Sequence, residues 1–450
     1  MNARLFALAA AGASLLASPA LAQGVISERS VAAHEAFLAS DALQGRGSAT
    51  RDEAIAAAYV ASEFQSYGLA PAPGMDGYLQ PATLIRVVLN GEPTMSAAGV
   101  QLPSPTLLIG PGTSVSGPLV VADTGDPAKL PRADVLLVPS PSADLRVIAQ
   151  AARDEGTKLL VLPLNEATQK YVGIMGGKPR LPTYLEGDGP DTKMSIVLLP
   201  LGAIAELAKK SGAVVTLTVP SRQERSTTTN AIGYLKGSDP KAGTLLLTAH
   251  LDHLGVQPDG TIMHGANDDA SGTTAVLELA QALASGKQPR RSILFVCYGS
   301  EELGGFGSTY FAEHSPVPLS DMVANIEFEM IGAQDPKLPA NTLMMTGFER
   351  SNLGPALKEH GALVTGDPYP EEHFFERSDN YSLALKGVVA HTVSGWAVTP
   401  TYHQPTDTYA NLNIPFMTNA IRSLVAPVEW LANSDFVPAW KPGGKPEPDR

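Results

Sequence analysis

Apolar runs that end in polar residues dominate the middle of the chain. Residues 244–249 (TLLLTA) and 292–298 (SILFVCY) are short and rich in Leu, Ile, Val and Phe, as is typical of strands buried on both faces. Residues 270–283, between them, have the apolar spacing of a helix. This order predicts an α/β fold whose central sheet is mixed but mostly parallel, with helices on both faces.

Histidine and carboxylate side chains stand where these elements begin or end. Strands of an open α/β sheet bind ligands at their carboxyl ends, so we expect these side chains to gather there. Histidine combined with carboxylate favours zinc or a similar divalent ion, whereas an all-carboxylate calcium site would not need the imidazoles. The residues concerned are His250 and Asp252 after the first strand, Asp268 and Asp269 before the helix, and Glu301 and Glu302 after the second strand.

Two more candidates follow towards the C-terminus. Residues 322–330 (MVANIEFEM) predict a strand that carries Glu329 near its end, and an acidic residue there costs free energy unless it is paired or bound. Residues 388–393 predict another buried strand, which leads into a polar loop with His403 and Asp407. A helix is expected over 414–431, and the Pro-rich residues 436–450 predict a disordered tail.

The N-terminal residues 1–22 predict a signal peptide. Arg4 precedes an apolar run that ends in Ala-Leu-Ala, the small-x-small pattern of a cleavage site. A membrane anchor is the alternative, but the run is short for a span and Ser-Pro interrupts it. We therefore expect an exported protein, periplasmic or extracellular, with no membrane anchor after cleavage.

A change in composition predicts an inserted domain at 89–227. Strand-like runs alternate there with one or two helices, histidine is absent, and the carboxylates are scattered. We expect a smaller, β-rich and non-catalytic domain, with 23–88 and 228–435 forming the catalytic one. Residues 230–236 are expected to form a hairpin with the strand that ends at His250.

Charge and cysteine content exclude some classes of function. The chain has 450 residues and a net charge of −13, which argues against a nucleic-acid surface and against an anchor on anionic membranes. Cys297 is the single cysteine, so no intramolecular disulfide can form. Its place in an apolar strand favours a buried, inert thiol over a nucleophile.

Taken together, the motifs resemble the di-zinc exopeptidases of metallopeptidase family twenty-eight, secreted bacterial aminopeptidases among them. The resemblance implies the zinc exopeptidase fold, and ADVLLVPS with ARDEGTKLLVLP resembles the protease-associated domain that relatives often carry as an insertion. The matching segments are LASDALQGRGS, TAHLDHLG, GANDDASGTTAVLELA, SEELGGFGS, NIEFEMIG, RSDNYSLALKG and YHQPTDT, within residues 36–88 and 228–432.

The resemblance assigns roles to individual residues. Two zinc ions per chain are implied, with His250 and Glu329 on one, Glu302 and His403 on the other, and Asp268 bridging both. Glu301 would be the general base, and Asp252 would orient the His250 ring. A cis peptide bond between Asp268 and Asp269 is also implied. Three departures concern Glu329, where relatives more often have Asp, the Ser-Asp-Asn of 378–380, and the Asn-Asp-Asp of 267–269.

The expected function is an exported metallo-exopeptidase that hydrolyses the N-terminal bond of a peptide substrate. A carboxypeptidase or a glutaminyl cyclase, which would work with one zinc, are alternatives on the same fold. An inactive binding module is the alternative from another class, and it would be expected to lack ligands. The preferred terminal residue and the oligomeric state do not follow from the sequence.

Overall fold

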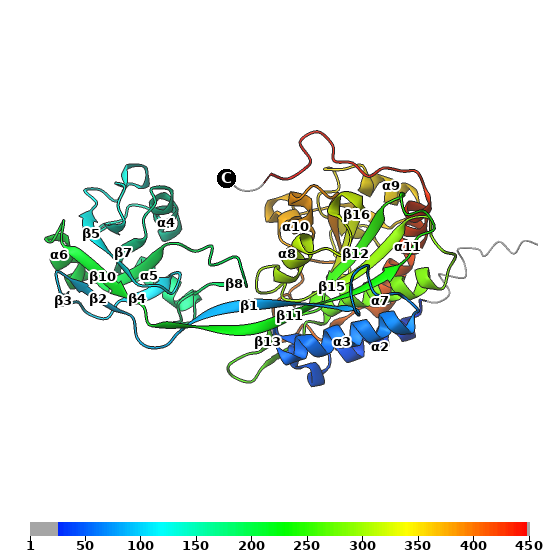
Figure 1. Ribbon diagram of the computed structural model, residues 1–450, viewed down its shortest axis with the longest axis horizontal. Coiled ribbons are helices and arrows are strands. Elements are labelled where there is room, and N and C mark those ends of the chain that lie inside the picture. The colour runs from blue at the N-terminus through cyan, green and yellow to red at the C-terminus, as the bar shows by residue number, and fades with distance from the viewer. Residues whose placement is uncertain (1–25, 448–450) are drawn as a thin grey trace, which may run out of the picture. The chain divides into compact units, whose positions relative to one another are not determined.

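A computed structural model describes residues 26–447, which form two compact units (Figure 1). Residues Ala82–Thr227 form the inserted unit, and the described residues on either side of it form the other, here called the metal unit. The predicted signal peptide, 1–22, lies outside the described residues. The sequence analysis placed the first domain boundary at residue 88, whereas the two units divide after Pro81. Strand β1 (Leu79–Leu89) runs across both positions.

The metal unit is built on a mixed sheet whose central strands are parallel. Strand β12 lies between β15 and β16, and β19 pairs with β16, all in parallel register. In spatial order the strands are β18 (Val364–Gly366), β17 (Leu343–Met345), β19 (Ala390–Ser394), β16 (Met322–Glu329), β12 (Thr244–His250), β15 (Ser292–Tyr298), β11 (Ser221–Leu235) and β1. The predicted fold class is confirmed.

The hairpin expected between β11 and β12 is wrong. Strand β11 pairs antiparallel with β15, on the side of β15 away from β12. The connection after β11 crosses the start of β15, and Gly237 permits this close approach, since a Cβ there would lie 2.5 Å from the carbonyl oxygen of Arg290. The hydrophobic pattern of a strand shows which residues are buried but not which strand lies beside it, so the pattern did not reveal the crossing.

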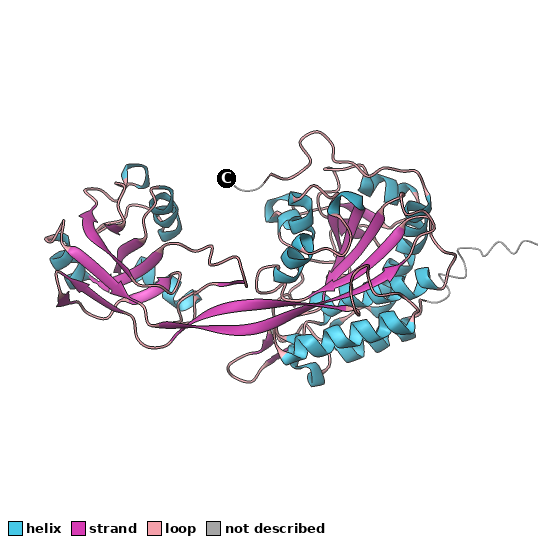
Figure 2. Cartoon of the chain, viewed as in Figure 1, coloured by secondary structure: helices cyan, strands magenta, loops and turns pink. Residues whose placement is uncertain are grey.

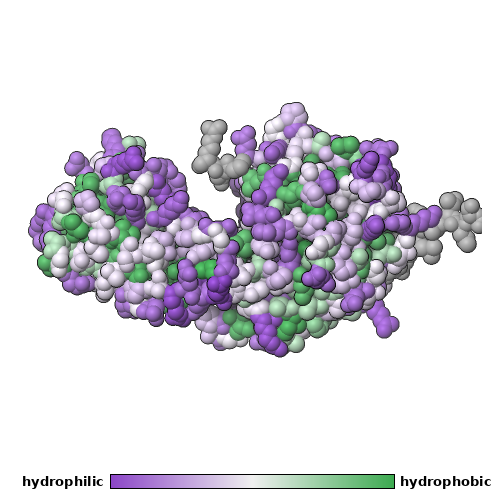
Figure 3. Space-filling view, in the orientation of Figure 1, coloured by the Kyte–Doolittle hydropathy of each residue, from purple (hydrophilic) through white to green (hydrophobic). Residues whose placement is uncertain are grey.

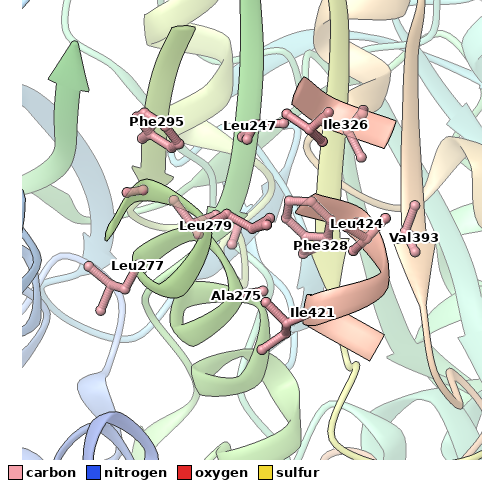
Figure 4. Close-up of a cluster of buried hydrophobic side chains, with 14 of the residues drawn as sticks. Leu247, Ala275, Leu277, Leu279, Phe295, Ile326, Phe328, Val393, Ile421 and Leu424 are labelled. Atoms are coloured by element: carbon pink, nitrogen blue, oxygen red, sulfur yellow. The ribbon is translucent and has the colours of Figure 1, made fainter. Parts of the chain in front are cut away.

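Helices cover both faces of this sheet (Figure 2). Figure 4 shows one face, where side chains of the strands, such as Leu247 and Ile326, meet Leu279 of α7 and Leu424 of α11. On the other face Leu246 and Leu294 pack with α8 and α10. Burial on both faces explains the continuous apolar runs. The first layer holds α2 (Glu28–Leu38), α3 (Arg51–Ser66), α7 (Ser271–Ala284) and α11 (Ile414–Asn433), and the second α8 (Phe306–Glu313) and α10 (Asn380–Leu385), while α9 (Leu353–Glu359) follows β17.

The inserted unit has its own eight-stranded sheet and three helices among its described elements. Helix α5 was not predicted from the sequence. The strands are β2 (Thr94–Ala97), β3 (Val100–Gln101), β4 (Thr106–Ile109), β5 (Val115–Val121), β6 (Val135–Leu137), β7 (Leu159–Leu164), β9 (Ser195–Pro200) and β10 (Val214–Thr218), and the helices α4 (Leu145–Asp154), α5 (Glu166–Ile174) and α6 (Leu201–Ala208). Strand β8 (Thr183–Leu185) pairs instead with β1.

The prediction of a disordered tail is wrong for residues 436–447. Trp440 forms a β-bridge with Ser351, and its ring packs against Phe375 and His391. Asn352 donates to the Ala439 carbonyl through its backbone N–H at 3.1 Å. Composition does not reveal that such a proline-rich segment is ordered, because one aromatic side chain and a few backbone hydrogen bonds are enough to dock it.

Within 26–447, no helix combines the length and hydropathy needed to cross a bilayer. Hydrophilic side chains cover much of the visible face, with apolar ones scattered among them (Figure 3).

Candidate metal centre

The parallel strands bring the predicted ligands to one edge of the sheet. His250 is the last residue of β12, Glu329 is the last residue of β16, and Glu302 lies in the turn after β15. Asp268 lies in the short segment Ala266–Ala270 before α7, where its own backbone angles are not helical, and His403 lies in the loop between β19 and α11. Because parallel strands end at the same edge, residues far apart in sequence meet there.

Potential ligand atoms form two groups that share Asp268. One group contains His250, Asp268 and Glu329, and the other His253, Asp268 and Glu302, with the ligand atoms of each within 4.8 Å of one another. Asp268 Oδ1 lies 3.3 Å from His250 Nε2, whereas Oδ2 lies 3.8 Å from His253 Nδ1. The two carboxylate oxygens of Asp268 therefore face different imidazoles.

His403 stands beside the second group. Its Nε2 lies 3.2 Å from Asp268 Oδ2 and 3.1 Å from Glu302 Oε2. All five residues expected as ligands are thus brought together. The sequence analysis missed His253, which lies three residues after His250 in the same TAHLDHLG segment. That short spacing was the available signal, since a turn after the strand can return a side chain to the same site.

Several of these atoms are buried without a hydrogen-bond partner. They are His250 Nε2, His253 Nδ1, Asp268 Oδ2 and Glu302 Oε1. Buried polar atoms are nearly always paired, and a cluster of unpaired ones calls for an ion or a ligand. Imidazole nitrogens and carboxylate oxygens are the donor set of zinc, and a cation shared by these atoms would pair all of them. The residues therefore fit a zinc centre.

Asp252 holds the loop of the two glutamates. Its carboxylate accepts hydrogen bonds from the backbone N–H groups of Glu301, at 2.9 Å, and Glu302, at 3.3 Å, and from the Ser48 hydroxyl at 2.5 Å. The expected contact with the His250 ring is weaker, because Nδ1 lies 3.7 Å from the carboxylate but 3.2 Å from the backbone carbonyl of Asp252. The carbonyl, then, is the closer partner of this ring.

Asp269 connects the elements that carry the first group. Its carboxylate accepts hydrogen bonds from the backbone N–H groups of His250 at 3.3 Å, Met330 at 3.0 Å and Gly272 at 2.9 Å. It thereby joins the ends of β12 and β16 to the start of α7. The peptide bond between Asp268 and Asp269 is cis, as the resemblance implied.

Arg46 braces the same region from a fully buried position. Its guanidinium donates four hydrogen bonds of 2.6 to 2.9 Å to backbone carbonyls. Charge-assisted bonds of this kind are stronger than neutral ones. The acceptors are Leu38, Leu251, His264 and Gly265, so the side chain ties the segment after β12 to the segment before Asp268.

Glu53 supports the turn that leads to Glu301. It accepts hydrogen bonds from the backbone N–H and the hydroxyl of Ser300, at 3.1 and 2.9 Å. The other oxygen accepts from the Thr228 hydroxyl and the Thr229 N–H, both at 3.0 Å. Ser300 has a left-handed backbone with φ of 54°, and these bonds hold it there.

The pKa values of Glu301 and Asp268 are shifted in opposite directions. Burial raises the pKa of Glu301 well above its ordinary value; His250 lowers this pKa, while Asp379 and Glu329 raise it further. For Asp268, burial alone would raise the pKa, but the imidazoles of His250 and His403 outweigh it and hold the pKa below the ordinary value. The pKa values of these two carboxylates thus lie on opposite sides of the ordinary value, and the imidazoles around Asp268 favour its charged form.

A pocket opens beside Glu329, which forms part of its wall. Ligand pockets are mostly apolar with a few polar groups. The other wall positions were not predicted from the sequence as a pocket, because they come from five separate segments. The walls combine Met330, Met344, Phe374, Ala397 and Tyr402 with Thr346, Arg377, Ser378, Thr392 and Ser394.

Known proteins similar to this chain are peptidases. Residues 230–426 match the model of "Peptidase family M28". The "probable leucine aminopeptidase 2" of Aspergillus oryzae is 24% identical over 330 residues, which cover 70% of this chain and 62% of that protein. "Aminopeptidase YwaD" of Bacillus subtilis is 35% identical over 122 residues, 26% of this chain and 25% of that protein. This chain thus spans less than two thirds of either relative.

Solved structures share the fold. An aminopeptidase from Aneurinibacillus sp. strain AM-1 has a TM-score of 0.59 at 19% identity, covering 94% of this chain and 98% of that one. A zinc aminopeptidase from Bacillus subtilis has a TM-score of 0.55 at 20% identity, with the same coverage. At these identities the likeness concerns the fold alone. The matched region spans every candidate ligand, from His250 to His403, so the part of the chain that carries the candidate site resembles peptidase family M28.

Proposed function

We propose that this protein is a zinc-dependent aminopeptidase that removes N-terminal residues from peptides with a pair of zinc ions. The position of Asp268 carries the proposal, because its two oxygens face His250 on one side and His253 and His403 on the other. A carboxylate in this position can bridge two ions, which in two-metal sites lie about 3.5 to 4 Å apart. The family and the names of its relatives support the same activity.

Each side chain has a task in this proposal. Bound zinc would supply Lewis acidity towards the scissile carbonyl and lower the pKa of a coordinated water. Glu301 would accept the proton of the attacking water and pass it to the leaving amine, for which its raised pKa is suitable. Asp252 would position Glu301 and Glu302 through their backbone N–H groups.

The pocket beside Glu329 would receive the side chain of the N-terminal residue. Its wall of two methionines, Phe374 and Ala397 suits an apolar side chain. Arg377 would not bar this, because it pairs with Glu372 at 3.3 Å and lies 5.0 Å over the Phe374 ring. We therefore expect leucyl and methionyl substrates to be cleaved faster than glutamyl or lysyl ones.

A substrate panel tests the proposal. Aminoacyl-nitroanilides, their N-acetylated forms and peptides with free C-termini should be compared with and without a chelator. Activity on free N-termini alone, abolished by chelator and restored by zinc, is the expected result. Release of C-terminal residues would indicate a carboxypeptidase instead, and cyclisation of N-terminal glutamine a glutaminyl cyclase.

Metal content is the second test. Elemental analysis of the purified protein should find close to two zinc ions per chain. A single zinc with full activity would favour the cyclase alternative, and a protein without zinc or activity would favour a binding module. Five filled ligand positions and a filled base position argue against the last.

The resemblance of the inserted unit to protease-associated domains remains a prediction. Export of the protein is proposed from the pattern of residues 1–22. The N-terminus of the protein recovered from its native host tests export, since cleavage after Ala22 would leave Gln23 first. Recovery in the cell interior with Met1 intact would contradict it.

A further inference from the structure

His253 is a histidine of the metal centre with no role in the five-ligand scheme. It is fully buried, and its Nδ1 lies 2.8 Å from Glu302 Oε1 and 3.8 Å from Asp268 Oδ2. Gly265 makes room for the ring, because a Cβ there would lie 2.4 Å from His253 Cγ. The imidazole is thus held against the two carboxylates of the second group.

The contact with Glu302 is short. His253 Nδ1 and Glu302 Oε1 lie 2.8 Å apart, and both atoms are buried without a well-aligned hydrogen-bond partner, as is His253 Nε2. Nδ1 and Oε1 belong to the group whose potential ligand atoms lie within 4.8 Å of one another. A cation held between them would pair both atoms.

The two imidazoles of this region face each other across Glu302. His253 lies next to Oε1 and His403 next to Oε2. Their ring centroids are 5.7 Å apart with planes at 75°, a separation that fits two imidazoles bound to one zinc at about 2.0 to 2.1 Å. His253 reaches this point from the buried side and His403 from the partly exposed side.

We propose that His253 is a ligand of the second zinc, which it binds through Nδ1 together with Asp268, Glu302 and His403. This inference rests on the proposed zinc-dependent function. Four residues would then hold the second zinc, and three, His250, Asp268 and Glu329, would hold the first. We therefore expect the second zinc to be bound more tightly than the first.

Zinc affinity tests the proposal first. Chelator competition should resolve a tight and a weaker zinc in the native protein. His253→Ala should weaken the tight step by more than about 100-fold, since the loss of an outer partner of a ligand already costs about 10 to 100-fold. His264→Ala is the matched control, because this neighbouring histidine pairs with Asp41 at 2.7 Å outside the site. An unchanged tight step in His253→Ala would overturn the proposal.

A spectroscopic test separates a ligand from a residue that only supports one. In His253→Cys loaded with cobalt(II), a thiolate bound to the metal gives a sulfur-to-cobalt charge-transfer band. The shorter side chain still reaches because His253 approaches through its nearer ring nitrogen. The native protein controls for Cys297, which is buried in β15. A band in the variant alone is expected, and its absence from a folded, cobalt-loaded variant would refute ligation.

The tests remain distinct from those of the proposed function. A native protein without stoichiometric zinc or aminopeptidase activity would remove the function itself. A native protein with two zinc ions and full activity, whose His253→Ala and His253→Cys variants bind as the native protein does and show no new band, would remove only the role of His253. Circular dichroism of each variant without metal shows whether it is folded.

Discussion

Asp407 accepts a hydrogen bond from the backbone N–H of Asp268 at 3.0 Å, and its other oxygen accepts from the N–H of Asn267 at 2.9 Å. Asp407 lies in the same loop as His403 and is almost fully buried. One carboxylate therefore connects the loop of a proposed ligand to the backbone of the residue that both proposed sites share.

Asp407→Asn should weaken zinc binding. An amide keeps one accepting oxygen but turns its NH2 group towards a backbone N–H, so one of the two bonds is lost and two donors face each other. We expect an affinity loss of about 10 to 100-fold, the usual effect of losing an outer partner, measured by chelator competition. The exposed Asp321→Asn is the matched control. Equal affinities in both variants would show that the loop needs no such connection.

Glu301→Gln should keep the zinc and lose turnover. If Glu301 is the general base, kcat should fall by at least about 100-fold, the lower range of a general-base contribution. Elemental analysis and stopped assays on a leucyl substrate give the two readouts, with Glu313→Gln, on the exposed end of α8, as the control. Loss of zinc from Glu301→Gln would mean that Glu301 and Glu302 have exchanged roles.

Arg46→Lys should destabilise the metal unit strongly. A lysine ammonium cannot reach the four carbonyls that the guanidinium binds, and each buried carbonyl left unpaired costs about 1 to 3 kcal/mol. We expect a loss of more than about 3 kcal/mol in the free energy of unfolding, measured with urea. Arg51→Lys is the control, since this side chain is 86% exposed. A loss below about 1 kcal/mol would contradict the bracing role.

His391 should make the stability fall in acid. Burial lowers its pKa to about 4; the Thr346 carbonyl, which accepts from Nδ1 at 2.9 Å, opposes the shift, and Arg350 adds to it. The unfolded chain has the ordinary value of about 6.5, so it binds the proton first. The contribution is complete above pH 6.5 and is lost as the pH falls towards 4, by roughly 3 kcal/mol.

Replacement of His391 checks this sign. Urea midpoints of the native protein and of His391→Asn should be compared between pH 4.5 and 8 in the presence of a chelator, which removes the effect of metal release. The difference between the two proteins should shrink as the pH falls below 6.5. His314→Asn, exposed at the end of α8, is the control. A difference that stays constant over this range would contradict the lowered pKa.

The local pattern predicted the fold class and a set of candidate polar residues at the element ends, from which the family resemblance selected the proposed ligands. Thr244–His250 and Ser292–Tyr298 are buried throughout, and parallel strands place whatever follows them at one edge. Strand order was beyond reach, since the neighbours of β11 and β12 are set by packing and not by the local pattern of either strand. The residue spacing did not reveal His253 as a site residue either, because its burial depends on Gly265, which has no side chain.

Long-range contacts account for the rest of what was missed. Arg46 and Glu53 act on segments more than 170 residues away, and their own neighbourhood gives no sign of this. Trp440 docks a segment whose composition resembles a flexible tail. The pocket walls and the four hydrogen bonds of Arg46 therefore became visible only with the chain folded.

The bonds of Glu53 to Thr228 and Thr229 also bear on how the chain folds. They close a loop of 175 residues, and most of that loop is the inserted unit. Once the inserted unit has folded, β1 and β11 lie side by side as neighbouring strands, so its entry and exit are held together. The folded inserted unit then acts like a cross-link in a metal unit that is still unfolded. It lowers the entropic cost of closing the loop between Glu53 and Thr228. We expect the inserted unit, whose residues leave the ribosome before residues 228–450, to fold before α3 finds its partners in the later half of the chain.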